Sequence, residues 1–204
     1  MNPKFHSLTI KDVRKETKDA VSISFEIPNE LIQDFQFSAG QYLTFKTLID
    51  KEEVRRSYSL CSSPNENEWR VAIKEIENGK FSRFANHSLK KGNVLEVMMP
   101  SGNFKLKTTK GCNKSYVLFA AGSGITPIYS MIKQILVFEP HRKLTLLYAN
   151  SNEEHIIFKE ELKGLANQYH QFKYIDFISG KRELKKRIWL KLPIPNTLFA
   201  DQMR

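Results

Sequence analysis

The hydrophobic pattern of the 204-residue chain changes once, near residue 107, and this change limits the folds open to it. Before that point, short runs of β-branched and aromatic residues alternate with turn signals, as is typical of an antiparallel sandwich or barrel. Among these runs are Val21–Ile27, Tyr42–Phe45, Trp69–Ile73 and Val94–Met98. The pattern predicts a closed six-stranded antiparallel barrel over residues 1–108, with one short helix packed on it near Phe81–Leu89.

A different pattern follows the polar segment Lys107–Lys114, which we interpret as a domain boundary. Tyr116–Ala121 is a continuous apolar strand of the kind buried on both faces. Two amphipathic helices, one from Pro127 and one carrying Phe158, Leu162, Leu165 and Tyr169, alternate with the strands Leu144–Ala149 and Phe172–Ile178. This βαβαβ order predicts a partial doubly wound parallel sheet over residues 109–180. The remaining residues, 181–204, form a basic tail to which we assign no role.

Several classes of protein are disfavoured by composition. A helix that spans a bilayer needs about 20 apolar residues. The most apolar run of this chain is far shorter, so we expect a cytoplasmic protein without membrane association. Two cysteines cannot supply the four thiolates of an iron–sulfur cluster, and the five histidines lack close ligand spacing, so we expect no metal.

The net charge of +10 is compatible with nucleic-acid binding, because clustered Lys and Arg residues attract phosphate backbones. Residues 181–204 carry seven Lys and Arg against two acidic residues, which accounts for half of the excess. A charged run of this kind is typical of a solvated surface or a loose end. We therefore expect no nucleic-acid partner.

The most informative stretch runs from Arg55 to Pro64, where cationic, aromatic and hydroxyl residues alternate. Strand alternation places Arg56 and Tyr58 on one face. A flavin dinucleotide needs a cation for its pyrophosphate, a flat apolar surface for its ring and small donors near the ring nitrogens, and this strand offers all three. An ordinary surface strand with a core tyrosine stays open as the alternative.

Two glycine-containing turns suit phosphate groups. One turn leads into a helix and consists of Gly79, Lys80, Phe81 and Ser82. The first N–H groups of a helix attract anions, although a plain helix cap would look the same. Gly122 and Gly124 lie between a strand and a helix, where glycines let the backbone approach a diphosphate. The third glycine of the dinucleotide fingerprint is absent, so a tight turn without ligand is the alternative here.

Several of these segments together resemble the ferredoxin–NADP reductase family, in particular the reductase components of aromatic-ring oxygenases. Arg56-Ser57-Tyr58-Ser59 resembles the R-x-Y-S flavin signature, and Gly122 to Pro127 the G-x-G-x-x-P loop. Three further segments match in order: Ala39-Gly40-Gln41-Tyr42, Gly79-Lys80-Phe81-Ser82 and Pro100-Ser101-Gly102-Asn103-Phe104. The resemblance implies that the barrel binds FAD and that the partial parallel sheet binds NAD(P).

The resemblance also implies roles for particular residues. Arg56 would bind the pyrophosphate, Tyr58 would stack on the isoalloxazine, and Ser59 would sit near flavin N5, so that Tyr58 and Ser59 are the catalytic candidates. Thr126 would lie near the nicotinamide. The backbone that would line the flavin ring comes from Val71, Ala72, Ile73 and Lys74.

Asn150 and Ser151 occupy the place of the adenosine ribose, where the arginine that many relatives use for the 2′-phosphate of NADP is missing. Glu153 is an alternative acceptor for a ribose hydroxyl. NADH and NADPH therefore both stay open.

The resemblance further implies an oxidoreductase that passes electrons from NAD(P)H through FAD to an iron–sulfur domain or protein, serving an oxygenase component as in phenylacetate degradation. FAD is preferred to FMN by likeness alone. The family's C-G-P segment and its ferredoxin domain have no counterpart in the sequence, so we expect a truncated chain, and an inactive one stays open. The alternative is a non-catalytic interaction module with weak or no flavin binding, which pairs through an exposed sheet edge, for example as a homodimer.

Overall fold

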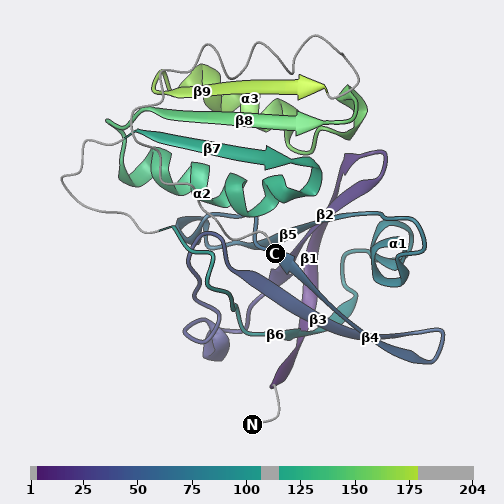
Figure 1. The fold of residues 1–204 in the computed structure, drawn as a ribbon. Coiled ribbons are helices and arrows are strands. Elements are labelled where there is room, and N and C mark those ends of the chain that lie inside the picture. Colours follow the sequence, from purple (N-terminus) through teal and green to yellow (C-terminus); the bar gives the residue numbers. More distant parts are fainter. Residues whose placement is uncertain (1–3, 107–114, 179–204) are drawn as a thin grey trace.

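The computed structural model describes residues 4–106 and 115–178. The predictions for the segment Lys107–Lys114 and for the basic tail lie outside the described residues. Figure 1 shows a β-rich lower part and an upper part in which a parallel sheet packs with helices. Among the described residues, no helix combines the length and apolarity needed to cross a bilayer.

The first sheet contains six strands in the order β4-β3-β6-β1-β2-β5, and every neighbouring pair is antiparallel. The strands are β1 (Phe5–Thr17), β2 (Ala20–Glu26), β3 (Tyr42–Ile49), β4 (Glu52–Ser59), β5 (Trp69–Lys74) and β6 (Val94–Met98). The antiparallel fold predicted for this half is thus confirmed.

The barrel closes less completely than predicted. Between the terminal strands β4 and β5 there is one isolated bridge, Leu60 to Val71, and the Cys61 N–H donates to the Arg70 carbonyl at 2.8 Å. The six strands therefore form a barrel-like sheet without a continuous ladder at the β4–β5 seam. Beyond that bridge, the edge of β5 is available to other partners.

Alternation of side chains builds the core of this sheet. Leu8, Ile10, Ile23, Leu43 and Phe45 are at most 1% exposed and face inward. The helix α1 (Lys80–His87) packs on the barrel by burying Phe81 and Ala85, as the spacing predicted. Two short 3-10 turns, η1 (Asn29–Leu31) and η2 (Pro64–Glu66), complete the connections.

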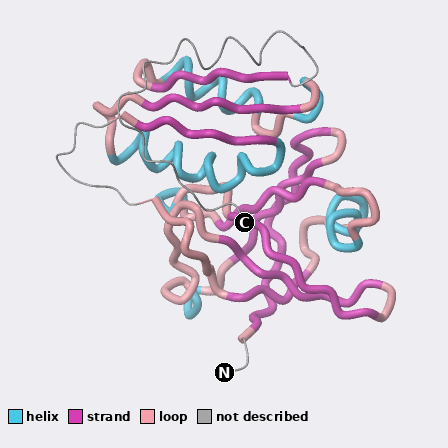
Figure 2. Tube along the Cα trace, viewed as in Figure 1, coloured by secondary structure: helices cyan, strands magenta, loops and turns pink. Residues whose placement is uncertain are grey.

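The second sheet has the parallel order β7-β8-β9. Its strands β7 (Tyr116–Ala121), β8 (Leu144–Asn150) and β9 (Phe172–Ile178) alternate with helices α2 (Ile125–Phe138) and α3 (Lys159–Gln168). Short 3-10 turns follow two of the strands: η3 (Gly122–Gly124) after β7 and η4 (Glu153–His155) after β8. This is the βαβαβ unit predicted from the sequence, and Figure 2 shows its alternating strands and helices.

The prediction that Tyr116–Ala121 is buried on both faces is wrong. Tyr116, Leu118 and Ala120 pack against the core formed with the helices, whereas Val117 is 37% and Phe119 60% exposed. In the described part of the chain, α2 and α3 join one core with Leu144, Leu146 and Tyr148, which share one face of β8. The opposite face of β7 therefore keeps apolar side chains in contact with solvent.

The two sheets pack together through small residues of the barrel. Ala20, Ala39, Cys61 and Ala72 belong to the same buried cluster as the apolar face of α2. Two polar contacts reinforce this interface: the Ser130 hydroxyl donates to the Ser62 carbonyl at 2.6 Å, and the Lys133 ammonium lies 2.5 Å from the Glu66 carboxylate. Because small side chains allow close approach of the backbones, these four barrel residues join the core of the parallel sheet, while the interior of the barrel forms a second core.

Candidate functional site

Strand β4 presents Arg56 and Tyr58 on the face that also carries the buried Val54. The Tyr58 ring lies against Phe45 and Phe81, with centroids 6.0 and 5.6 Å apart. Burial raises the pKa of Tyr58 to about 12, against a smaller opposing effect of the Arg56 charge, so the phenol stays protonated at neutral pH. The Arg56 guanidinium is exposed and donates to the Arg55 carbonyl at 2.7 Å. A cation and an aromatic hydroxyl thus lie two positions apart on one face of the terminal strand β4.

The two serines of this strand lie on its other face. The Ser57 hydroxyl is 2.8 Å from that of Thr44 on β3. Ser59 is partly buried and pairs with Tyr42 across the same ladder. Because side chains alternate along a strand, both serines point away from the Arg56 face and can serve a ligand there through their backbone.

The segment predicted to line the flavin ring has buried side chains, so only its backbone is available to a ligand. Val71, Ala72 and Ile73 are at most 4% exposed, and their side chains belong to the two cores. Strand β5 pairs with β2 along one edge, and the bridge at Val71 is the last strand pairing on its other edge in the described chain. The Lys74 side chain is 23% exposed and marks the end of this strand.

The turn before α1 has the features of an anion site. No side chain caps the helix N-terminus, so the first N–H groups are left without a capping partner. A Cβ on Gly79 would lie 2.3 Å from the Ser82 hydroxyl, which explains the glycine by space. That hydroxyl donates to the Gly79 carbonyl at 3.1 Å and accepts from the Ile76 N–H at 3.2 Å, so Ser82 shapes the turn. Phe81 is buried in the barrel core, and the Lys80 ammonium pairs with Glu52 at the β3–β4 hairpin.

The other two motifs of the barrel, around Gly40 and around Ser101, have a structural role. The backbone of Tyr42 exchanges two hydrogen bonds with Ser101, at 2.9 and 3.0 Å. Gly40 has φ +102° and its Cβ would lie 2.0 Å from the Phe104 carbonyl oxygen, so only glycine fits there. The segments Gly40–Tyr42 and Pro100–Phe104 therefore meet directly beside Ser59.

The glycine turn after β7 leaves open space in front of its backbone. Gly122 has φ +50°, and a Cβ on either Gly122 or Gly124 would meet nothing within 4 Å. The Tyr148 hydroxyl of the neighbouring strand donates to the Gly122 carbonyl at 2.9 Å and holds the turn. Thr126 is buried, and its hydroxyl donates to the Ser123 carbonyl at 3.1 Å. This turn can admit a diphosphate against backbone N–H groups at the start of α2.

Asn150 ends β8 and carries a buried side-chain amide that could serve a ligand. Its side chain is 5% exposed, and neither amide atom makes a hydrogen bond of normal geometry in the described chain. An unsatisfied buried amide costs about 1–3 kcal/mol, which a ligand with hydroxyl groups would relieve. Ser151 and Glu153 follow on the exposed side, with the Lys159 ammonium 3.2 Å from the Glu153 carboxylate. The residues present therefore fit the ribose of a dinucleotide.

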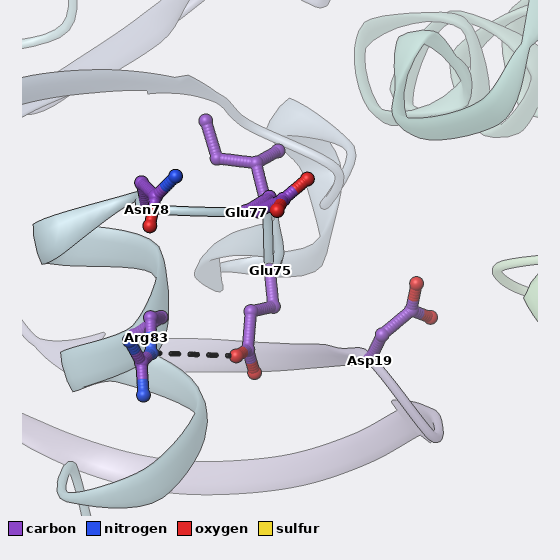
Figure 3. A pocket seen from close by; sticks show the side chains of 6 residues that line it. Asp19, Glu75, Glu77, Asn78 and Arg83 are labelled. Atoms are coloured by element: carbon purple, nitrogen blue, oxygen red, sulfur yellow. Dashed lines mark ion pairs between the residues drawn. The ribbon is translucent and has the colours of Figure 1, made fainter.

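Two cavities accompany these sites. One of about 360 Å³ lies between the β1–β2 turn and the β5–α1 loop, lined by Asp19, Glu75, Ile76, Glu77, Asn78 and Arg83 (Figure 3). The other, of about 100 Å³, lies between η2 and the helices α2 and α3. Neither of these two cavities is lined by Arg56 or Tyr58.

Four further residues that link the two domains carry no signal in the sequence. Lys18 and Asp19 of the β1–β2 turn contact Glu154 and His155 of η4, across 136 positions of sequence. No local pattern marks such a pair, because each partner looks like an ordinary surface residue of its own segment.

Among the described residues, no group of three or more His, Cys, Asp or Glu side chains could hold a metal ion. Cys61 is buried, its thiol donates to the Arg70 carbonyl at 3.3 Å, and burial raises its pKa to about 12. This cysteine is therefore a packing residue.

Two family models match the chain in succession. Residues 7–106 match the oxidoreductase FAD-binding domain, and residues 118–190 match the oxidoreductase NAD-binding domain. The predicted cofactor classes, FAD and a nicotinamide dinucleotide, are confirmed at the level of these domains.

Individual proteins agree with this assignment. The chain is 42% identical over 167 residues to a component of the 1,2-phenylacetyl-CoA epoxidase of Escherichia coli, covering 82% of the chain and 47% of the relative. It is 40% identical over 164 residues to the ferredoxin reductase component of 3-ketosteroid-9-alpha-monooxygenase of Rhodococcus rhodochrous, covering 79% of the chain and 46% of the relative. The chain thus spans about half the length of these curated relatives.

A solved structure carries the same fold. Phthalate dioxygenase reductase, described as a modular structure for electron transfer from pyridine nucleotides to [2Fe-2S], superposes with a TM-score of 0.72 at 28% identity. The match covers 89% of this chain and 54% of that protein. With a barrel-like flavin domain, a parallel nucleotide domain and both family models in the expected order, the chain belongs to the ferredoxin-reductase family of FAD- and NAD-binding oxidoreductases.

Proposed function

We propose that this chain binds FAD and NAD(P)H and carries the flavin half-reaction of a cytoplasmic oxygenase reductase, passing electrons to an iron–sulfur partner as in phenylacetate degradation. The observation that carries the proposal is the buried, unsatisfied amide of Asn150 beside the open Gly122 turn, on a chain whose barrel presents Arg56 and Tyr58. Relatives named as components of an epoxidase and a monooxygenase support the class of partner.

The roles of this chain's residues follow from their placement. Arg56 and the uncapped start of α1 supply positive charge for a pyrophosphate. Tyr58, held protonated, offers an aromatic face and a hydroxyl donor, and the free edge of β5 offers backbone hydrogen bonds to a flat ring. When bound, FAD supplies acceptance of two electrons from a dihydronicotinamide and their release one at a time.

The residues of the parallel-sheet domain would orient the bound NAD(P)H. The Gly122 turn admits the diphosphate. The Asn150 amide can accept a hydrogen bond from a ribose hydroxyl or donate one to it. Thr126 sits in the first turn of α2, where a nicotinamide would approach the barrel. No ionisable side chain is needed as a general base at this step, because the hydride carries its own electron pair.

Steady-state oxidation of NADH and NADPH by the FAD-loaded chain, with ferricyanide as acceptor, tests the activity. We expect turnover that depends on added FAD. A chain that retains FAD but oxidises neither nucleotide would contradict the catalytic proposal.

A second function is favoured by one observation, the exposed apolar face of β7. Val117 and Phe119 lie exposed on the edge strand of the parallel sheet, where a second chain could pair. A protein that elutes as a dimer and takes up no FAD would favour this interaction module over the reductase.

A further inference from the structure

The turn between β1 and β2 reaches from the flavin domain to the nucleotide domain. Its Asp19 carboxylate lies 2.9 Å from the His155 Nδ1 atom of η4 and 3.5 Å from the Lys74 ammonium at the end of β5. The Thr17 hydroxyl donates to the same carboxylate at 2.7 Å. One side chain therefore joins three segments that are distant in the sequence.

The backbone of Asp19 adds a fourth link. Its carbonyl accepts a hydrogen bond from the Glu75 N–H at 2.7 Å, which fixes the turn to the residue that follows β5. Burial alone would raise the pKa of the Asp19 carboxyl, but the hydrogen bonds from His155 and Thr17 and the Lys74 charge together lower it. The carboxylate is thus ionised at neutral pH, so it can pair with the Lys74 ammonium while it contacts the His155 Nδ1 atom.

The partners of Asp19 belong to the two proposed ligand sites. His155 closes the η4 turn, which follows shortly after Asn150, the ribose candidate. Lys74 ends the segment whose backbone would line the flavin. Asp19 also lines the 360 Å³ cavity beside the Gly79 turn, and Figure 3 shows its carboxylate across this cavity from the Glu75–Arg83 ion pair. In Figure 1 the β1–β2 hairpin rises on the side toward which β7 and β8 point.

We propose that Asp19 is a positioning residue for electron transfer: through His155 and Lys74 it holds the nucleotide-binding turn in register with the flavin-lining strand. This inference rests on the proposed function. Transfer of a hydride requires the reacting atoms to lie about 3–3.5 Å apart, and a misplacement of about 1 Å can cost about 100-fold in rate. A partly buried link between the two binding segments, formed by residues of both domains, can hold the reacting atoms at such a separation.

The same turn supplies a matched control. The Lys18 ammonium pairs with Glu154 at 2.7 Å and bridges the same two elements, but the two side chains are 59% and 71% exposed. Exposed pairs of this kind contribute little to stability, because water screens their charges. In contrast, the Asp19 and His155 side chains are 24% and 19% exposed and share further partners. If any contact between these two elements were enough to position the nucleotide, loss of either pair would slow flavin reduction equally.

The first test compares Asp19→Asn, Asp19→Glu and Lys18→Ala in the FAD-loaded full chain, by stopped-flow reduction of the flavin with NADH and with NADPH. We expect Asp19→Asn to lower the limiting reduction rate at saturating nucleotide by about tenfold or more, with FAD affinity within threefold of wild type. Asp19→Glu should recover part of the rate, and Lys18→Ala should stay within about twofold of wild type.

A second readout needs no cofactor. Hydrogen–deuterium exchange of the FAD-free chain should rise at Glu75 and across η4 in Asp19→Asn, and stay unchanged there in Lys18→Ala. An Asp19→Asn protein with wild-type reduction rate, or with exchange no faster than Lys18→Ala, overturns the proposal. A wild-type chain whose flavin no nucleotide reduces would instead overturn the proposed function, and the exchange comparison would still decide whether Asp19 holds the domains.

Discussion

The barrel and the parallel sheet of this molecule bury their strands to different degrees. In the barrel, the inward side chains of β3, such as Leu43 and Phe45, are fully buried. In the parallel sheet, β7 packs one face on α2 and leaves Val117 and Phe119 exposed on the other. The barrel is therefore self-sufficient in its core, whereas the nucleotide half depends more on contacts with the barrel.

The largest expected effect is on stability, and it is measured by comparing one aromatic residue from each sheet. Phe45→Ala should lower the free energy of unfolding by about 3–5 kcal/mol, because it leaves a cavity beside Phe25, Tyr58 and Phe81. The Phe119 ring is 60% exposed. Phe119→Ala should therefore change the free energy of unfolding by about 0.5 kcal/mol at most. Urea denaturation of both variants measures the difference, and equal losses would mean that the outer face of β7 is covered in solution.

The next effect concerns flavin affinity on the barrel side. Arg56→Ala should weaken FAD binding about 10- to 100-fold, because it removes a charge-assisted contact to phosphate. Arg55→Ala is the control, since the neighbouring guanidinium lies on the opposite face of β4 and pairs with Glu53 at 2.7 Å. Quenching of FAD fluorescence on titration gives both dissociation constants. The assignment of Arg56 fails if the two variants bind FAD equally.

On the nucleotide side, Asn150→Leu should reduce NAD(P)H affinity by about tenfold without loss of stability. The substitution keeps the volume of a buried side chain whose amide makes no hydrogen bond of normal geometry among the described residues, so the folded protein loses little stability. Asn152→Ala, at an exposed position two residues later, should leave affinity unchanged. Isothermal titration with both nucleotides, paired with thermal melts, separates binding from folding. A destabilised Asn150→Leu with normal affinity would indicate a structural role instead.

The smallest effect concerns the boundary between the two regions. Burial raises the pKa of the Glu16 carboxyl, against the hydrogen bond from Ser22, and the Glu161 carboxylate of α3 adds to the rise. A carboxyl with a raised folded-state pKa favours folding when protonated, so its ionisation destabilises the protein as pH rises through that pKa. Glu16→Gln should therefore raise Tm at neutral pH by a few degrees, with the gain vanishing in acid.

Thermal melts across acidic and neutral pH measure this gain. Glu30→Gln, an exposed carboxyl on the barrel, serves as the control. A pH-independent difference between Glu16→Gln and the wild type would show that the carboxyl charge is not its cause.

The elements of both halves were predictable because each follows from a local period. Val94–Met98, Tyr116–Ala121 and Phe172–Ile178 match the observed strands residue for residue. The exposure of Phe119 was not predictable, since an apolar run does not reveal how many faces its neighbours cover. The closure of the barrel likewise depends on one bridge, Leu60 to Val71, which pattern alone does not specify.

The candidate site was predictable in part. The glycine turns and the Arg56–Ser59 segment carry local signals, whereas the roles of individual side chains depend on contacts. Ser82 and Thr126 use their hydroxyls on their own turns, and Phe81 is a core residue. Asp19 and His155 gave no signal, because their pairing forms only when the domains pack.

The central claim is that the two halves of this chain hold FAD and a nicotinamide nucleotide in reacting distance. Its most direct test is to load the purified full chain with FAD, remove unbound flavin by gel filtration and record the visible spectrum anaerobically before and after NADH or NADPH. The account predicts that the flavin band elutes with the protein and is bleached by nucleotide. A protein fraction without flavin absorbance, or a bound flavin that neither nucleotide bleaches, would contradict it.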